Sequence, residues 1–185
     1  MIAFPKPYAD RAARLRAPLG LVLVLLFAWF SDPSVRSLAW GMPIAILGLL
    51  LRAWATGHLE KDKRLAQSGP YAYVRNPLYL GTLLAAAGFV LSCRRWQLAV
   101  LFAAVFVFIY LPVIGLEEQH LRDLFPGFDA YSQRVPALWP TLRPLHAAGS
   151  FRWDLYKRHR EYQALLAFLA GTALLVVKVL IPGIP

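Results

Sequence analysis

A short stretch around Arg75 combines a positive charge with a helix start at the edge of an apolar segment. Asn76 is a favourable N-cap residue, and Pro77 suits the first helical position, where a missing N–H costs nothing. A helix start leaves backbone N–H groups unpaired and carries partial positive charge. Beside Arg75, such a start can bind an anion. A lone arginine here is also typical of a helix anchored at a membrane surface, so both interpretations stay open.

Two carboxylates, Glu117 and Glu118, follow the apolar segment that comes next. At a helix C-terminus the macrodipole opposes each of them by roughly 0.3–1 kcal/mol. The pair fits either a helix that continues into solvent as an amphipathic extension or a site for a cationic or hydroxyl-bearing ligand. In the second case we expect Arg75 and Glu117 to face each other across one pocket, which would suit a zwitterion.

The elements that carry these residues are apolar. Of 185 residues, 58% are hydrophobic and only 16% are charged, whereas soluble domains are about half apolar and about a quarter charged. A membrane-spanning helix needs about 20 residues, with about 17 as a lower limit. The apolar residues gather in blocks at 18–30, 37–56, 77–92, 96–116 and 164–181. The first block is short and can span a membrane only if residues 12–17 extend it. The sequence predicts an all-α, polytopic transmembrane helical bundle of about five membrane helices, with a pocket on its cytosolic side.

The order of the blocks predicts four parts of the chain. These are a cytosolic N-terminal arm (1–16), a transmembrane helical hairpin (17–56), a core (57–146), and a basic segment with a C-terminal transmembrane helix (147–185). The link at 93–95 is very short, so the helices on either side of it must be antiparallel neighbours. We therefore expect Asn76 and Leu116 to lie next to each other at the same membrane face.

Positive charge is unevenly distributed among the loops. Of the 20 lysines and arginines, 15 lie before the first block or in the second and fourth connections, and only three lie in the alternate connections. The positive-inside rule then places the N-terminus and the pocket in the cytosol, and we expect a bacterial inner membrane. The basic balance indicates contact with anionic membrane lipids, and no motif indicates nucleic acid.

Several common chemistries lack their signatures in this sequence. There is no Gly-x-Gly pair, so neither a dinucleotide-binding fingerprint nor a phosphate-binding loop is expected. One cysteine and four scattered histidines do not have the spacing of zinc or di-iron ligands, so we expect no metal. An enzyme with this sequence would bind its cofactor by other means.

The polar motifs, taken in order, resemble the isoprenylcysteine carboxyl methyltransferase and phospholipid methyltransferase family of integral membrane enzymes. The resemblance runs from about His58 to Pro144 and rests on Gly-x-Tyr, Arg-x-Pro-x-Tyr-x-Gly, Glu-Glu and Phe-x-x-Tyr, that is, on Gly69, Tyr71, Arg75, Pro77, Tyr79, Gly81, Glu117, Glu118, Phe128 and Tyr131. It implies methyl transfer from S-adenosylmethionine to a lipid or lipidated substrate.

The resemblance also implies roles for individual residues. It assigns cofactor binding to the loop before the third block, the start of that block and the first glutamate, namely Lys61, Leu65, Tyr71, Asn76, Pro77, Leu78, Tyr79 and Glu117. Our own expectation from the residues is that Arg75 and Glu118 act in catalysis. The aromatic residues near Tyr131 would be either interfacial anchors or walls for a flat ring.

The sequence departs from the family pattern at two positions. The family usually has histidine where this chain has Asn76, so ring protonation is lost while hydrogen bonding is kept. Isoprenylcysteine enzymes carry an arginine four residues before the glutamate pair, where this chain has Val113. The last apolar block is an addition to the family core.

The function expected is an S-adenosylmethionine-dependent membrane methyltransferase acting on a lipophilic or lipid substrate. Two other functions stay open: a non-catalytic membrane scaffold or lipid-binding protein of the same fold, and a nicotinamide-dependent reductase of the sterol type on a similar frame.

Overall fold

The computed structural model describes residues 4–145 and 148–181, and the regular structure of this part is helical, as predicted. The predicted boundary between 146 and 147 lies outside the described residues. The helices are α1 (Lys6–Phe30), α2 (Val35–Thr56), α3 (Pro77–Cys93), α4 (Trp96–Val105), α5 (Leu111–Leu124), α6 (Phe128–Arg134), α7 (Trp153–Arg158) and α8 (Tyr162–Leu180). A 3-10 turn, η1 (Gly69–Ala72), precedes α3, and a π-helical segment, η2 (Phe106–Tyr110), joins α4 to α5.

Within the described residues, four helices are long and apolar enough to cross a membrane: α1, α2, the continuous helix Trp96–Leu124, and α8. The remaining apolar helix, α3, has 17 residues. The first helix begins at Lys6, well before residue 17, because prolines suit its first turn and Ala9 and Ala12 are buried. The helix that carries Glu117 and Glu118 continues to Leu124, as the amphipathic-extension interpretation required.

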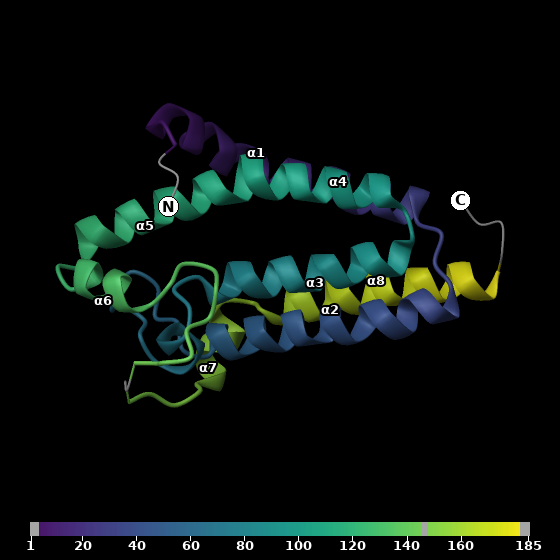
Figure 1. The fold of residues 1–185 in the computed structure, drawn as a ribbon. Helices are drawn as coiled ribbons and strands as arrows, with labels where there is room; N and C mark the ends of the chain where they lie inside the picture. The colour runs from purple at the N-terminus through teal and green to yellow at the C-terminus, as the bar shows by residue number, and fades with distance from the viewer. Residues whose placement is uncertain (1–3, 146–147, 182–185) are drawn as a thin grey trace.

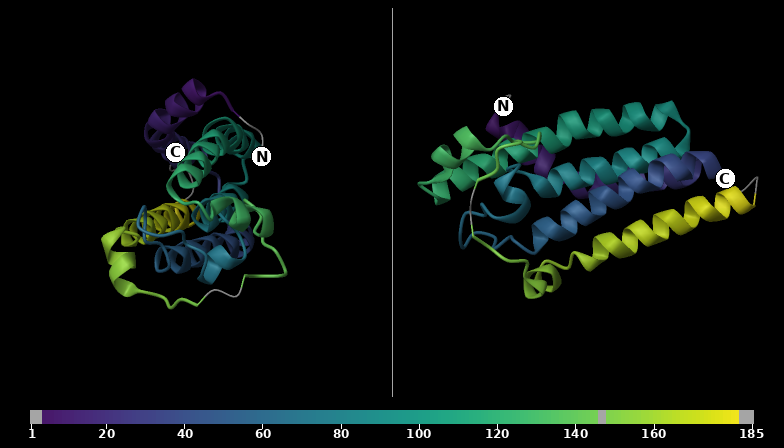
Figure 2. Two further views of the ribbon diagram at one scale, coloured as in Figure 1. Left: turned by 90° about the vertical axis from the view of Figure 1, so that its left-hand side faces the viewer. Right: turned by 60° about the horizontal axis from the view of Figure 1, so that its bottom comes forward.

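The helices form two layers, with α1, α4 and α5 in one and α2, α3 and α8 in the other (Figure 1). The chain runs back and forth, so the connection 57–76, helix α6 and helix α7 gather at one end of the bundle (Figures 1 and 2). We call this the site end. The short connections 31–34 and 94–95 lie at the opposite end.

Small residues bring α2 and α3 into backbone contact. Gly41 and Gly48 of α2 face Gly88 and Gly81 of α3, and a Cβ atom at Gly81 would lie 2.7 Å from the Gly48 carbonyl oxygen. A contact this close excludes any side chain there, as in small-residue packing between membrane helices. The predicted pairing of the first two membrane helices is therefore not the main one: α1 packs against α5 and η2, while α2 packs against α3.

The π segment has a cause in the sequence. Pro112 has no N–H, and its ring would clash with the carbonyl of Phe108, four residues earlier. The helix widens at Phe106–Tyr110, and the Leu111 N–H bonds to the Phe106 carbonyl oxygen. The Phe108 carbonyl instead accepts a hydrogen bond of 2.7 Å from the Tyr8 hydroxyl of α1. The proline thus helps to join α1 to the helix beside it.

This account predicts a coupled pair of substitutions. Tyr8→Phe should lower the free energy of unfolding by about 1 kcal/mol, because the Phe108 carbonyl loses its donor. In a Pro112→Ala background the new N–H at position 112 can serve that carbonyl, so Tyr8→Phe should have almost no effect. Thermal unfolding in detergent of the wild type, the two single variants and the double variant measures the difference. An equal loss of stability from Tyr8→Phe in both backgrounds would contradict the account.

Candidate functional site

The start of α3 is held in place by the proline-rich segment that follows α6. The N–H groups of Arg75 and Asn76 donate to the carbonyl oxygens of Pro136 and Ala137, at 2.8 and 3.1 Å. The Thr141 N–H donates in turn to the Tyr73 carbonyl at 2.9 Å. These bonds occupy backbone groups that precede the helix and fix its direction.

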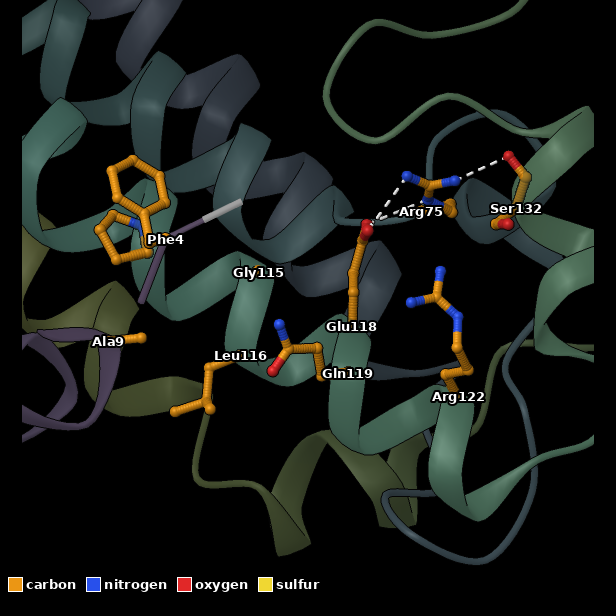
Figure 3. A pocket seen from close by; sticks show the side chains of 10 residues that line it. Phe4, Ala9, Arg75, Gly115, Leu116, Glu118, Gln119, Arg122 and Ser132 are labelled. Atoms are coloured by element: carbon orange, nitrogen blue, oxygen red, sulfur yellow. Dashed lines mark hydrogen bonds and ion pairs between the residues drawn. The ribbon is translucent and has the colours of Figure 1, made fainter. Parts of the chain in front are cut away.

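Arg75 and Glu118 form a two-pronged ion pair. The Arg75 Nε and one terminal nitrogen donate to the two Glu118 oxygens at 3.0 and 3.1 Å. The other terminal nitrogen donates to the Ser132 carbonyl of α6 at 2.7 Å. The two side chains are only 13% and 11% exposed, so the pair lies largely out of water. A single arginine therefore joins the start of α3 to α5 and α6 (Figure 3).

Asn76 occupies the predicted N-cap position, but its side chain does not cap the helix. Its amide donates to the Glu118 carboxylate at 2.9 Å and to the Ala137 carbonyl at 3.2 Å. Glu118 thus accepts three hydrogen bonds from residues at the start of α3. The expected closeness of this start to the region around Leu116 is confirmed, with Glu118 as the residue that makes the contact.

Glu117 points in a different direction from Glu118. Its carboxylate accepts a hydrogen bond of 2.8 Å from the Tyr79 hydroxyl and lies 3.7 Å from the Arg16 guanidinium. Arg16 also donates to the Tyr79 oxygen at 3.0 Å. The expectation that Arg75 faces Glu117 is therefore wrong, because consecutive helical residues point about 100° apart. The Glu117 side chain is 50% exposed, unlike that of Glu118.

A cavity of about 340 Å³ lies beside the ion pair. Its polar side includes Arg75, Glu118 and Arg122, and its apolar side includes Phe4 and Leu116 (Figure 3). Both residues predicted to be catalytic line this cavity. None of the eight residues predicted to bind the cofactor is among the residues that line it. Asn76 nevertheless bonds to Glu118, so the two predicted sets meet at the start of α3.

The other predicted cofactor residues have varied surroundings. Tyr71 is buried, and its carbonyl accepts a hydrogen bond of 2.8 Å from the Tyr131 hydroxyl. Leu65 packs on the core cluster of Phe128, Tyr131 and Val135. Pro77 is buried and Leu78 is partly buried at the first turn of α3, whereas Lys61 is exposed in a turn.

The pKa of the Tyr71 phenol is shifted by burial and by neighbouring charged groups. Burial raises the pKa of Tyr71 far above its ordinary value, so the phenol stays neutral. Neighbouring charges modify this pKa further: those of Tyr131, Glu117 and Glu161 raise it, and that of Arg52 lowers it.

Sequence reasoning missed two contributors. It used Arg16 only to assign orientation, although the side chain reaches Tyr79 and Glu117. It also left Arg52 within a span without a role, although Arg52 pairs with Glu161 at 2.7 Å. An arginine inside an apolar block is itself a signal, because a charge in a membrane segment requires a partner.

The two glutamates should respond differently to neutralisation. Glu118→Gln leaves the Arg75 charge buried without its counter-charge and should lower the free energy of unfolding by about 3 kcal/mol. Glu117→Gln, at an exposed position, should change it by no more than about 0.5 kcal/mol. Unfolding of the two variants in detergent compares them. Equal losses of stability would show that the buried Arg75–Glu118 pair contributes no more than the exposed Arg16–Glu117 pair.

Comparison with known proteins identifies the relatives of this chain. Residues 15–127 match the phospholipid methyltransferase family. The nickel-cobalt-cadmium resistance protein NccN of Alcaligenes xylosoxydans xylosoxydans is 29% identical over 92% of this chain and 86% of its own length. The cobalt-zinc-cadmium resistance protein CzcN of Cupriavidus metallidurans is 33% identical over 55% of this chain and 47% of its own length.

A third relative has an enzymatic name. The protein-S-isoprenylcysteine O-methyltransferase of Schizosaccharomyces pombe is 24% identical over 74% of this chain and 60% of its own length. No solved structure matches the chain significantly. The family match covers more than half of the chain, including α3, the glutamate pair and most of α1. Together with the four helices of spanning length in the described part of the chain, this match makes the chain an integral membrane protein that belongs to the phospholipid methyltransferase family.

Proposed function

We propose that this protein transfers a methyl group from S-adenosylmethionine to a lipophilic or lipid acceptor at the site end of the bundle. The observation that carries the proposal is the difference between the two glutamates. Glu118 is buried and its carboxylate accepts three hydrogen bonds, whereas Glu117 is half exposed beside Tyr79 and Arg16. Glu117 can accept hydrogen bonds from a ligand without breaking the buried network.

The residues around Glu117 fit the groups of this cofactor. Its carboxylate suits an ammonium group or ribose hydroxyls, and Arg16 suits a carboxylate. The Tyr79 and Tyr110 rings meet edge to face with centroids 6.1 Å apart and offer an aromatic surface to adenine. Pro77 and Leu78 would form the floor of the cofactor site. Tyr71 and Leu65 would hold the loop before α3 in place, and Lys61 would lie at the edge of that loop.

The chemistry requires alignment more than activation. When bound, S-adenosylmethionine supplies a methyl group made electrophilic by its sulfonium. The protein would hold the acceptor in line with that methyl group and limit access of water. In this arrangement Arg75 and Glu118 act by fixing the start of α3. Arg75 and Glu118 also line the cavity, so an acceptor bound there would contact polar groups on that side.

The site end is proposed to face the cytosol of a bacterial cell, with the protein in the inner membrane. The uneven distribution of lysine and arginine supports this orientation. A cysteine at the exposed position 63, in a Cys93→Ser background, should react with a membrane-impermeant label only after the inner face is opened.

Two of the relatives are named for resistance to divalent metals. For this chain we propose methyl transfer without a metal. Among the described residues, no group of three or more histidine, cysteine, aspartate or glutamate side chains is placed to hold a metal ion. The scaffold and the reductase remain the competing functions, and cofactor binding in detergent separates them: nicotinamide binding would favour the reductase, and binding of neither cofactor would favour the scaffold.

The cofactor proposal predicts a specific loss of affinity. Purified protein should bind S-adenosylmethionine, and Glu117→Gln should weaken binding roughly ten- to hundredfold, because a charge-assisted hydrogen bond is worth about 1.5–3 kcal/mol. Asp123→Asn, which removes an exposed carboxylate from the same helix, is the matched control and should bind normally. Equilibrium dialysis with labelled cofactor measures both, and normal binding by folded Glu117→Gln would remove this carboxylate from the site.

The acceptor is proposed to be a neutral or cationic nucleophile, such as an amine or hydroxyl of a lipid or isoprenoid. A prenylated cysteine presents a carboxylate, which needs a fixed cation to offset its desolvation near the membrane. The position of the family arginine is the buried Val113. Of the nearby arginines, Arg75 is paired with Glu118 and Arg122 with Asp129.

This proposal predicts that a farnesylated cysteine analogue will not be esterified when it is offered with labelled S-adenosylmethionine. A membrane lipid extract from bacterial cells, offered in parallel, should acquire label in its amine- or hydroxyl-bearing fraction. Enzymatic formation of the farnesylcysteine methyl ester would contradict the proposal and assign its carboxylate to one of the arginines at the site end.

A further inference from the structure

The C-terminal helix α8 lies beyond the family match, which ends at residue 127. The residue just before it, Glu161, is buried, with a side chain only 8% exposed. A buried carboxylate at this position is costly unless it is paired and hydrogen-bonded. Its partner is therefore informative about what α8 contributes.

The partner is Arg52 of α2. Its Nε and one terminal nitrogen donate to the two Glu161 oxygens at 2.7 and 3.0 Å. Its remaining nitrogen donates to the Thr82 hydroxyl of α3 at 2.5 Å and reaches the Leu78 carbonyl at 3.5 Å. One guanidinium group thus links α2, α3 and α8, and two of its contacts lie within the first two turns of α3.

The packing leaves this arginine little freedom. A Cβ atom at Gly81 would lie 2.6 Å from the Arg52 Cγ atom, so the aliphatic part of the side chain lies directly on the α3 backbone. Arg52 is therefore held by close contact along its stem and by hydrogen bonds at its end. Its stem and its guanidinium group thus both contact the first turns of α3.

The start of α3 is the part of the helix that carries the candidate site. Leu78 lies between Pro77 and Tyr79, and the Tyr79 hydroxyl bonds to Glu117. The charges of Arg52 and Glu161 also act on the pKa of Tyr71, as that of Glu117 does. Through Leu78 and Thr82, the Arg52–Glu161 pair contacts the same turns of α3 that carry Tyr79.

We propose that Glu161 is a positioning residue of the methyl-transfer site, acting through Arg52 to fix the first turns of α3. The added C-terminal helix would then be part of the site's support and not only a membrane anchor. The inference rests on the proposed function for its ligand, S-adenosylmethionine, while the mechanical coupling between Glu161 and α3 stands on the contacts alone.

The opposite end of α8 offers a matched control. The buried Lys178 donates to the Trp29 and Ser31 carbonyl oxygens at 3.1 and 3.0 Å, next to the connection between α1 and α2. Lys178→Met removes an anchor of the same helix at the end far from the site. If α8 only stabilises the bundle, loss of either anchor should have the same consequences.

The experiment compares Glu161→Gln with Lys178→Met in the full-length protein in detergent. Binding of labelled S-adenosylmethionine should weaken roughly three- to thirtyfold in Glu161→Gln, a range typical of residues coupled to a ligand that they do not touch. Lys178→Met should bind within about twofold of the wild type. Glu161→Asp, which keeps the charge, should recover part of the affinity. Equal affinities in the Gln and Met variants would overturn the proposal.

Two further measurements guard against ambiguous outcomes. Hydrogen exchange of the peptide covering residues 77–84 should be faster in Glu161→Gln than in Lys178→Met, and unchanged exchange would refute the coupling even if the wild type binds no S-adenosylmethionine. If the wild type binds no S-adenosylmethionine, the proposed function fails, and the exchange measurement still tests the coupling between Glu161 and α3. If Glu161→Gln does not fold, Thr82→Val removes one Arg52 contact without stranding a charge and should also weaken cofactor binding; normal binding would count against the proposal.

Discussion

The rest of the structure depends on the backbone contact between α2 and α3. Glycines at 41, 48, 81 and 88 allow the two helices to approach until side chains no longer separate them. Since lipid tails are as apolar as the helices, such close packing is a main source of association within a membrane. The contact sets the position of α3 relative to Arg52. The residues at the start of α3 then bond to Glu118 and Glu117 of α5.

Polar groups then connect this helix pair to the remaining elements at the site end. Arg75 joins α3 to α5 and α6, and Arg52 joins it to α8. Each arginine uses its planar fork to bind a carboxylate and a third oxygen, a geometry that lysine does not offer. The buried pairs define where α3 begins, and the exposed Glu117 remains beside them for contact with a ligand.

Much of this arrangement was predictable from the sequence. Apolar blocks predicted the helices, and the three-residue link at 93–95 correctly predicted that the start of α3 would meet the glutamate pair. The sequence did not reveal which glutamate faces Arg75, because that depends on the rotation of α5 about its axis. Nor could it pair Arg52 with Glu161, 109 residues away. The seven-residue spacing of glycines in α2 and α3 was readable in advance and would have predicted their contact.

The π segment at Phe106–Tyr110 has a consequence for the angular phase of the helix. A π turn accommodates an extra residue, and each residue of an α-helix advances the side-chain direction by about 100°. The face of α5 is therefore offset from the face that α4 would present if the helix ran on regularly. Without this offset, neighbouring residues of α5 would point in the directions that the Glu117 and Glu118 side chains now take. Through the π segment, Pro112 thus fixes the rotation of α5, and this rotation decides that Glu118 is buried and Glu117 is exposed.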